Sequence, residues 1–393
     1  MMTERAILDW LAPRREEMIA LLAQIVNIDG GSYDKAGVDR VGRHLRDWLE
    51  RAGIACEVTP FAAQGDVLHA HVPGGGASAD DCGGGAGNAP ALLMGHMDTV
   101  FPPGEALRRP FSIIGDRGHG PGCADMKAGL VMNAFVLRAF AETGGAPAPL
   151  HGLFTGDEEI GSPASRPIIE AAAARACAVF NAEPGRANGN IVDGRRGGAF
   201  FRVTIAGRAA HAGLNPADGR SAIHELGRKI VAWHGLNDAA RDISVNVGLV
   251  SGGQSVNTIA PCATAEIDLR FSDPGDEARM AAAIASIAHA CAEDGLSAWI
   301  ETLGSFSPMA RNDGSAALTA LYLGAAAALG QGTAAEFTRS CADSGVASAT
   351  GTPTVCALGP VGGHAHSPEE YVELGSLVPR AQALALAIMR LGG

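Results

Sequence analysis

Short apolar runs alternate with amphipathic segments in the first half of the chain. Apolar runs over 91–95, 150–155 and 178–182 predict buried strands, and helical spacing over 126–142 and 164–174 predicts the helices between them. Strands that are apolar throughout and separated by helices are typical of a parallel sheet. The pattern therefore predicts an α/β domain, mostly parallel in its sheet, with helices on both faces.

The pattern changes after about residue 196. Four strand signals and two amphipathic helices follow in the order β-α-β-β-α-β, over residues 199–206, 221–236, 243–250, 263–271, 276–294 and 297–303. This order is that of a ferredoxin-like α+β unit. Helix and strand signals typical of the first domain return from about residue 310. We therefore expect a discontinuous α/β domain of residues 1–196 and 310–393, with a ferredoxin-like domain of residues 197–309 inserted into it.

Composition narrows the class of protein. With 393 residues, 47% of them hydrophobic and 18% charged, the chain is long enough for two globular cores. Its net charge of −12 argues against a nucleic-acid partner. The sequence has no apolar run long enough for a membrane span and no signal-peptide pattern at its start. We expect a cytoplasmic protein with neither a nucleic-acid nor a membrane partner.

Candidate metal ligands follow the predicted strands. His96 ends the first apolar run, the pair Glu158 and Glu159 follows the second, and Glu183 follows the third. Open parallel sheets build their binding sites at the carboxyl ends of strands. Together with Asp125 and His366, the set His96, Asp125, Glu159, Glu183 and His366 offers imidazole and carboxylate without thiolate. Such ligands suit zinc, with cobalt or manganese as substitutes.

Residues next to the candidate ligands in the sequence make this hypothesis more specific. Asp98 lies two residues past His96, close enough to orient the free nitrogen of a metal-bound ring. Adjacent side chains point in different directions, so one glutamate of the pair can bind metal while the other acts as a general base. By composition alone His364 could replace His366 as a ligand, although the spacing to Glu370 favours His366.

Five motifs occur in a characteristic order: GHMDTV, GPGCADMKAG, TGDEEIGS, NAEPG and GGHAHSPEEYV. With these five motifs in this order, the chain resembles the zinc-dependent aminoacylase/carboxypeptidase family. That family includes glutamate carboxypeptidase, acetylornithine deacetylase and succinyl-diaminopimelate desuccinylase. The resemblance covers nearly the whole chain, and it is strongest to the glutamate carboxypeptidase branch.

The resemblance implies two zinc ions per chain bridged by Asp125. His96 and Glu183 would complete one metal site, Glu159 and His366 the other, and Glu158 would be the general base. It also implies a cis peptide bond between Asp125 and Met126. Cys123 lies in the same motif, where it is either a small space-filling residue or a thiol that affects the metals.

The resemblance assigns roles to the inserted domain as well. This domain would dimerise the protein, and His211 in GRAAHAGLNP would reach into the partner's active site to stabilise the oxyanion. Asn257 in SVNTIAP and Arg270 in EIDLRF would bind the substrate carboxylate, to which a bidentate arginine is well matched.

These expectations combine into one predicted function. The homodimeric enzyme would hydrolyse an amide bond beside a free C-terminal carboxylate in a small peptide or an N-acyl amino acid, with C-terminal glutamate or aspartate as candidates. The alternatives are a deacylase of the acetylornithine or succinyl-diaminopimelate type and a catalytically silent binding protein.

Overall fold

The computed structural model describes residues 3–75 and 89–391. The glycine-rich segment 74–89, interpreted from sequence as a surface hairpin or insertion, falls almost entirely outside the described residues. The chain divides into two compact units, one of residues 1–194, 311–338 and 346–393, the other of residues 195–310 and 339–345. Among the helices described, none combines the length and the apolar character needed to cross a membrane.

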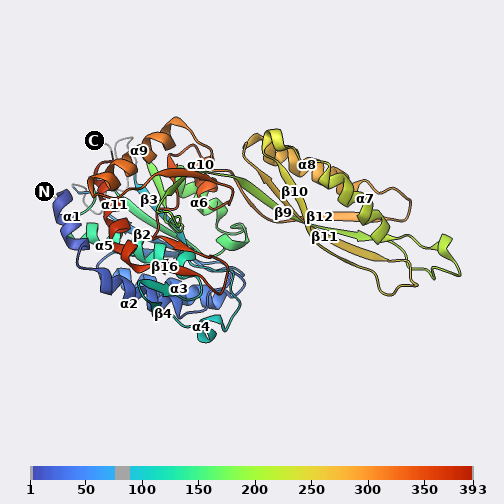
Figure 1. The fold of residues 1–393 in the computed structure, drawn as a ribbon, viewed down its shortest axis with the longest axis horizontal. Coiled ribbons are helices and arrows are strands. Elements are labelled where there is room, and N and C mark those ends of the chain that lie inside the picture. Colours follow the sequence, from blue (N-terminus) through green and yellow to red (C-terminus); the bar gives the residue numbers. More distant parts are fainter. Residues whose placement is uncertain (1–2, 76–88, 392–393) are drawn as a thin grey trace. The chain divides into compact units, whose positions relative to one another are not determined.

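A six-stranded sheet forms the centre of the larger unit (Figure 1). In spatial order its strands are β1 (Ala55–Thr59), β2 (Val67–Val72), β6 (Leu150–Thr155), β3 (Ala91–His96), β7 (Ala178–Asn181) and β14 (Thr354–Val355). The last four are mutually parallel, whereas β1 and β2 add an antiparallel edge. The predicted, mostly parallel sheet is therefore confirmed.

Helices cover both faces of this sheet. Leu93 of β3 packs into the cluster that contains α3 (Lys35–Glu50), α5 (Ala128–Glu142) and α11 (Leu377–Met389). Its neighbours Leu92 and Met94 point the other way and pack with α6 (Arg166–Ala173) and α10 (Ser344–Ala349). All six residues of β3 are buried because both of its faces are covered, which explains its continuous apolar sequence.

The remaining elements of the larger unit lie around this core. They include α1 (Glu4–Leu11), α2 (Arg15–Val26), α4 (Glu105–Arg108), α9 (Asp313–Ala328), and strands β8 (Ile191–Arg195) and β13 (Ala335–Thr338), which pair with each other. A second sheet has the order β15 (Gly362–Gly363), β16 (Tyr371–Glu373), β5 (Arg117–His119), β4 (Ser112–Ile114). Because β16 pairs with β5, the C-terminal motif lies beside the segment that carries Asp125.

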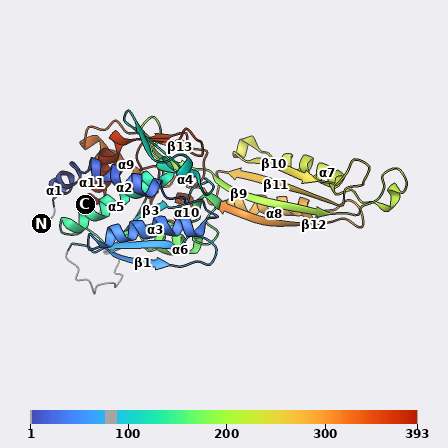
Figure 2. The ribbon, with the colours of Figure 1, turned by 90° about the horizontal axis from the view of Figure 1, so that it is seen from below.

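The smaller unit is a four-stranded antiparallel sheet with two helices (Figure 2). Its elements along the chain are β9 (Gly197–Ala206), α7 (Ala222–His234), β10 (Ser244–Gly252), β11 (Cys262–Phe271), α8 (Gly275–His289) and β12 (Ser297–Phe306). In space the strand order is β10-β11-β9-β12, as in ferredoxin-like units. Both helices pack on one face, since alternate residues such as Val203 and Ile205 form a single cluster with Leu226 and Ile284.

The segment 339–345, far from the rest of the smaller unit in sequence, packs within it. Arg195 donates a hydrogen bond from Nη1 to Ser340 Oγ at 2.8 Å, and Arg270 Nη1 lies 2.7 Å from Cys341 Sγ. The pattern of hydrophobic positions in the sequence does not predict this packing, because hydrogen bonds of polar side chains hold the segment.

Candidate metal centre

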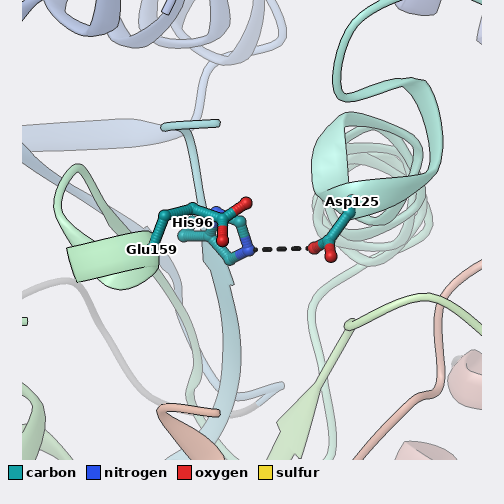
Figure 3. A group of neighbouring side chains, drawn as sticks. All are labelled: His96, Asp125 and Glu159. Atoms are coloured by element: carbon teal, nitrogen blue, oxygen red, sulfur yellow. Dashed lines mark hydrogen bonds and ion pairs between the residues drawn. The ribbon is translucent and has the colours of Figure 1, made fainter. Parts of the chain in front are cut away.

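The first group of donors lies at the carboxyl ends of β3 and β7. His96, the last residue of β3, is buried, and its Nε2 lies 3.2 Å from Asp125 Oδ1 and 3.6 Å from Glu183 Oε1. Figure 3 shows the imidazole of His96 pointing at the carboxylate of Asp125, which precedes helix α5, with Glu159 beside it. One donor atom each of His96, Asp125 and Glu159 lies within 4.8 Å of the others.

The second group shares Asp125 with the first. His366 Nε2 lies 3.1 Å from Glu159 Oε2 and 3.4 Å from Asp125 Oδ2. The two oxygens of Asp125 thus face different histidines. Zinc bonds of about 2.0–2.1 Å in tetrahedral geometry place neighbouring ligand atoms about 3.3 Å apart. The donor spacings in both groups therefore suit metal ions, with Asp125 able to contact one in each.

Opposite charges concentrate in this site. Burial and the nearby charge of Asp125 raise the pKa of Glu159 to about 7, while hydrogen bonds to Asp125 and Glu159 raise the pKa of His366 to about 10. Burial alone would lower the pKa of His96, but hydrogen bonds to Asp125 and Asp98 outweigh it and raise this pKa well above its usual value. The carboxylates thus favour positive charge between them, which bound cations would supply in place of protons.

Asp98 connects the ends of β3 and β6. Its carbonyl oxygen lies 3.0 Å from His96 Nδ1, and its Oδ1 lies 3.4 Å from the same nitrogen. The carboxylate also accepts hydrogen bonds from the backbone N–H groups of Glu158 and Glu159, both at 3.1 Å, and from Ser32 Oγ at 2.7 Å. Asp98 therefore orients the ring and also fixes the backbone of the glutamate pair. Nothing in the sequence points to Ser32.

The two adjacent glutamates occupy different surroundings. Both lie in the short 3₁₀ turn Glu158–Ile160, which begins two residues beyond the end of β6. Glu159 faces His366, whereas Glu158 is buried with its Oε2 4.0 Å from His96 Nε2. Glu158 is thus placed beside the donor groups rather than between His366 and Asp125.

Glu370 holds the turn that presents Asp125. Its carboxylate accepts hydrogen bonds at 2.9 Å from the backbone N–H groups of Gly122, Ala124 and Asp125. Burial raises the pKa of Glu370 to about 7. From sequence, Glu370 serves only as a spacing reference for His366, because an acid in HSPEEYV gives no local sign of burial. The expected cis peptide between Asp125 and Met126 is present in the same turn.

Three further residues of the motifs have packing roles. The His364 ring packs edge-on against Tyr371, with ring centroids 5.7 Å apart, so the structure brings His366 and not His364 to the donor groups. Cys123 is fully buried with its Sγ 3.5 Å from the Gly118 carbonyl oxygen, and burial raises its thiol pKa well above the usual value. Cys123 therefore fills space as a protonated thiol.

The glycine of the NAEPG motif, Gly185, has no room for a side chain. A Cβ on Gly185 would lie 2.7 Å from the Gly359 carbonyl oxygen and 2.9 Å from Arg380 Nη2. The close approach keeps the chain after Glu183 packed against the segment 359–362, to which Gly185 is hydrogen-bonded. The motif thus encodes a backbone contact next to a candidate ligand.

The other predicted residues lie in the smaller unit. His211 Nδ1 accepts hydrogen bonds from the N–H groups of Gly213 and Leu214, both at 3.1 Å, which places the ring proton on Nε2. The His211 loop pairs with the loop of Asn257, whose carbonyl oxygen accepts from Ala212 N–H at 2.9 Å. These two loops lie at one end of the sheet, beyond the end of β9 and before the start of β11.

Arg270 lies at the opposite end of β11. Its Nε donates to Asp268 at 2.7 Å, and its guanidinium lies over the Phe200 ring. The eight residue steps from Cys262 to Arg270 span about 26 Å of strand. Asn257 and Arg270 of one chain therefore cannot bind the same carboxylate, and a shared carboxylate requires them to come from different chains.

Comparisons with known proteins identify the family of this chain. Residues 92–390 match Peptidase family M20/M25/M40. The chain is 30% identical over 385 residues to carboxypeptidase G2 of Pseudomonas sp. (strain RS-16), covering 95% of this chain and 89% of that protein.

Solved structures share the fold at lower identity. The M20 family metallo-carboxypeptidase Sso-CP2 from Sulfolobus solfataricus superposes with a TM-score of 0.74 at 16% identity, covering 95% of this chain and 98% of the other. Aminopeptidase PepT from Bacillus cereus ATCC 10987 gives 0.70 at 22% identity, covering 96% and 99%. Sequence and fold agree, and the chain belongs to Peptidase family M20/M25/M40 as a hydrolase of the metallopeptidase class.

Proposed function

We propose that the protein is a dinuclear-metal carboxypeptidase or N-acyl-amino-acid amidohydrolase. It would cleave the amide bond beside a free C-terminal carboxylate, with C-terminal glutamate or aspartate as preferred residues. The observation that carries this proposal is the orientation of Asp125, whose two oxygens face His96 and His366 separately. The similarity to a carboxypeptidase over nearly the whole chain supports the substrate class.

The ligand sets follow from these two groups. His96, Asp125 and Glu183 would hold one zinc ion, and Asp125, Glu159 and His366 the other, with cobalt or manganese as substitutes. When bound, the two ions would supply Lewis acidity toward the scissile carbonyl and the attacking water.

Glu158 would move the proton during hydrolysis. Its buried carboxylate lies beside the donor groups, and the backbone N–H bond to Asp98 fixes its position. We assign it to accept a proton from the attacking water and to return that proton to the leaving amine. His211, with its proton on Nε2, would donate to the developing oxyanion.

A homodimer is proposed from the smaller unit. Strand β10 lies at the edge of its sheet, and Leu249 and Val250 on it are 64% and 60% exposed. Val231 of the neighbouring helix α7 is 74% exposed. Unpaired edge strands and exposed apolar side chains mark association surfaces, which suits a second copy of this chain.

Mixing two inactive variants tests whether His211 serves the partner chain. We expect His211→Ala chains and Glu158→Gln chains to regain activity together, because some mixed dimers contain a site with both an intact histidine and an intact base. Activity is measured after subunit exchange, which is confirmed by mass spectrometry of the mixed dimers. Homodimers of each variant, taken through the same procedure, are the control. If confirmed mixed dimers stay inactive, His211 acts within its own chain or outside the reaction.

A substrate panel tests the reaction itself. We expect turnover of N-acyl amino acids and dipeptides with a free carboxylate, and little turnover when that carboxylate is amidated. Arg270→Ala should raise KM sharply for substrates with a free carboxylate, because it removes a charged hydrogen bond that contributes about 1.5–3 kcal/mol to their binding. The KM of amidated substrates should be unchanged. Turnover confined to N-acetyl or N-succinyl diamino acids would instead identify a biosynthetic deacylase. No metal-dependent turnover would identify a binding protein.

A further inference from the structure

The loop that carries His366 is held by few contacts. Five of the six residues 364–369, which we call the His366 loop, are exposed. His364 and His366 have positive φ angles of 56° and 64°, which a residue other than glycine seldom keeps without support from its surroundings. Within the loop, Ser367 donates to the His364 carbonyl oxygen from its N–H at 3.2 Å and from its Oγ at 2.7 Å. The loop is therefore a small closed turn, whose position must be set by contacts from outside it.

Arg109 supplies such a contact. Its Nη1 donates to the carbonyl oxygen of Pro368, two residues past His366, at 2.8 Å. In the part of the chain that the structure describes, no other hydrogen bond reaches the His366 loop from outside residues 361–373, apart from the contacts of His366 with Asp125 and Glu159. Because the donor is a charged guanidinium, the bond to Pro368 is stronger than one between neutral groups.

Arg109 is itself held in place. Its Nε donates to the carboxylate of Glu105, which is 4% exposed, and its guanidinium carbon lies 4.9 Å from the centre of the Phe101 ring. Glu105 belongs to α4, and Asp29 accepts hydrogen bonds at 2.8 Å from two backbone N–H groups at the start of that helix. A side chain fixed at several points can hold a neighbouring segment with little further loss of freedom.

We propose that Arg109 is a positioning residue for the metal centre, which keeps His366 Nε2 beside Glu159 and Asp125 by holding Pro368. Among the described residues Arg109 contacts no donor group, so it acts through the backbone of the loop. The ion concerned is the one that the proposed function assigns to Glu159 and His366, and the proposal rests on that function. Removing a group that orients a metal ligand typically weakens metal binding by about 10–100-fold.

Cobalt binding by Arg109→Met tests this proposal, followed by visible absorption and by calorimetry. We expect one of the two ions to bind about tenfold or more weakly than in wild type, and the other to bind as in wild type. Arg108→Met is the matched control. Arg108 donates to the same Glu105 carboxylate at 2.8 and 2.7 Å but has no hydrogen bond to the His366 loop, so this variant should bind both ions as wild type does.

A more conservative variant guards against loss of folding. Arg109→Lys keeps the charge but not the planar fork that reaches Glu105 and Pro368 together, so it should show the same selective weakening to a smaller degree. This comparison stands even if Arg109→Met does not fold.

Two further measurements separate positioning from a general loss of structure. In a His366→Ala background, Arg109→Met should not change the affinity of the remaining ion, because the ligand that it positions is absent. In the metal-loaded protein, amide hydrogen exchange measured by mass spectrometry should be faster over residues 364–370 in Arg109→Met and unchanged in Arg108→Met.

Equal weakening of both ions, or wild-type cobalt binding and exchange in Arg109→Met, would overturn the proposal. A wild-type protein that binds a single ion would contradict the dinuclear function instead. The exchange of residues 364–370 would then still decide whether Arg109 holds the His366 loop.

Discussion

Replacing Glu158 by glutamine is expected to lower kcat by roughly 10²–10⁴-fold, the contribution typical of a general acid–base group. The amide keeps the size of the side chain but cannot accept the proton of the attacking water. Because the backbone N–H of Glu158, rather than its carboxylate, binds Asp98, the site geometry should be retained. Steady-state kinetics and metal analysis of the same preparation measure both effects.

The neighbouring glutamate provides the matched control. Glu159 Oε2 lies 3.1 Å from His366 Nε2, so Glu159→Gln should lose metal first and activity as a result. Excess zinc should partly restore Glu159→Gln and should not restore Glu158→Gln. If Glu158→Gln loses metal and regains activity with excess zinc, the two glutamates have been assigned in the wrong order.

Removal of metal by a chelator is expected to abolish activity completely. In the proposed site, cations would stabilise the three carboxylates of the two donor groups, and the Lewis acidity that the proposed reaction needs would come only from bound metal. Adding zinc or cobalt back should restore turnover. Metal analysis of the restored protein should give about two ions per chain, as expected of a two-metal hydrolase.

Variants of single ligands sharpen this measurement. Glu183→Gln should weaken the ion held with His96, and Glu159→Gln the ion held with His366, while Asp125→Asn should weaken both. A wild-type protein that keeps only one ion per chain at saturating zinc would contradict the bridging role of Asp125. Equal loss from all three variants would show that the two groups act as one site.

The strand pattern predicted where several residues of the candidate metal centre meet. His96 and the Glu158–Glu159 pair were placed because apolar runs of six residues become strands, and polar residues that follow parallel strands gather at one edge of the sheet. The alternation of strands and helices likewise predicted the fold class, because burial of both faces of a strand requires an apolar residue at nearly every position.

Other parts of the site could not be predicted from local pattern. Glu370 binds the amides of Ala124 and Asp125 across 246 and 245 residues, and Ser32 reaches Asp98 across 66. Hydrogen bonds between such distant segments leave no periodicity in the sequence.

The sequence by itself determined the fold class, the ferredoxin-like order of the second unit and the chemical nature of the donor set. These depend on residue type and on spacing within one element. Only the tertiary structure decided that His366 rather than His364 faces Glu159, and that Asn257 and Arg270 lie toward opposite ends of strand β11. Each of these depends on which side chains meet after the chain has folded, and that is set by packing between elements.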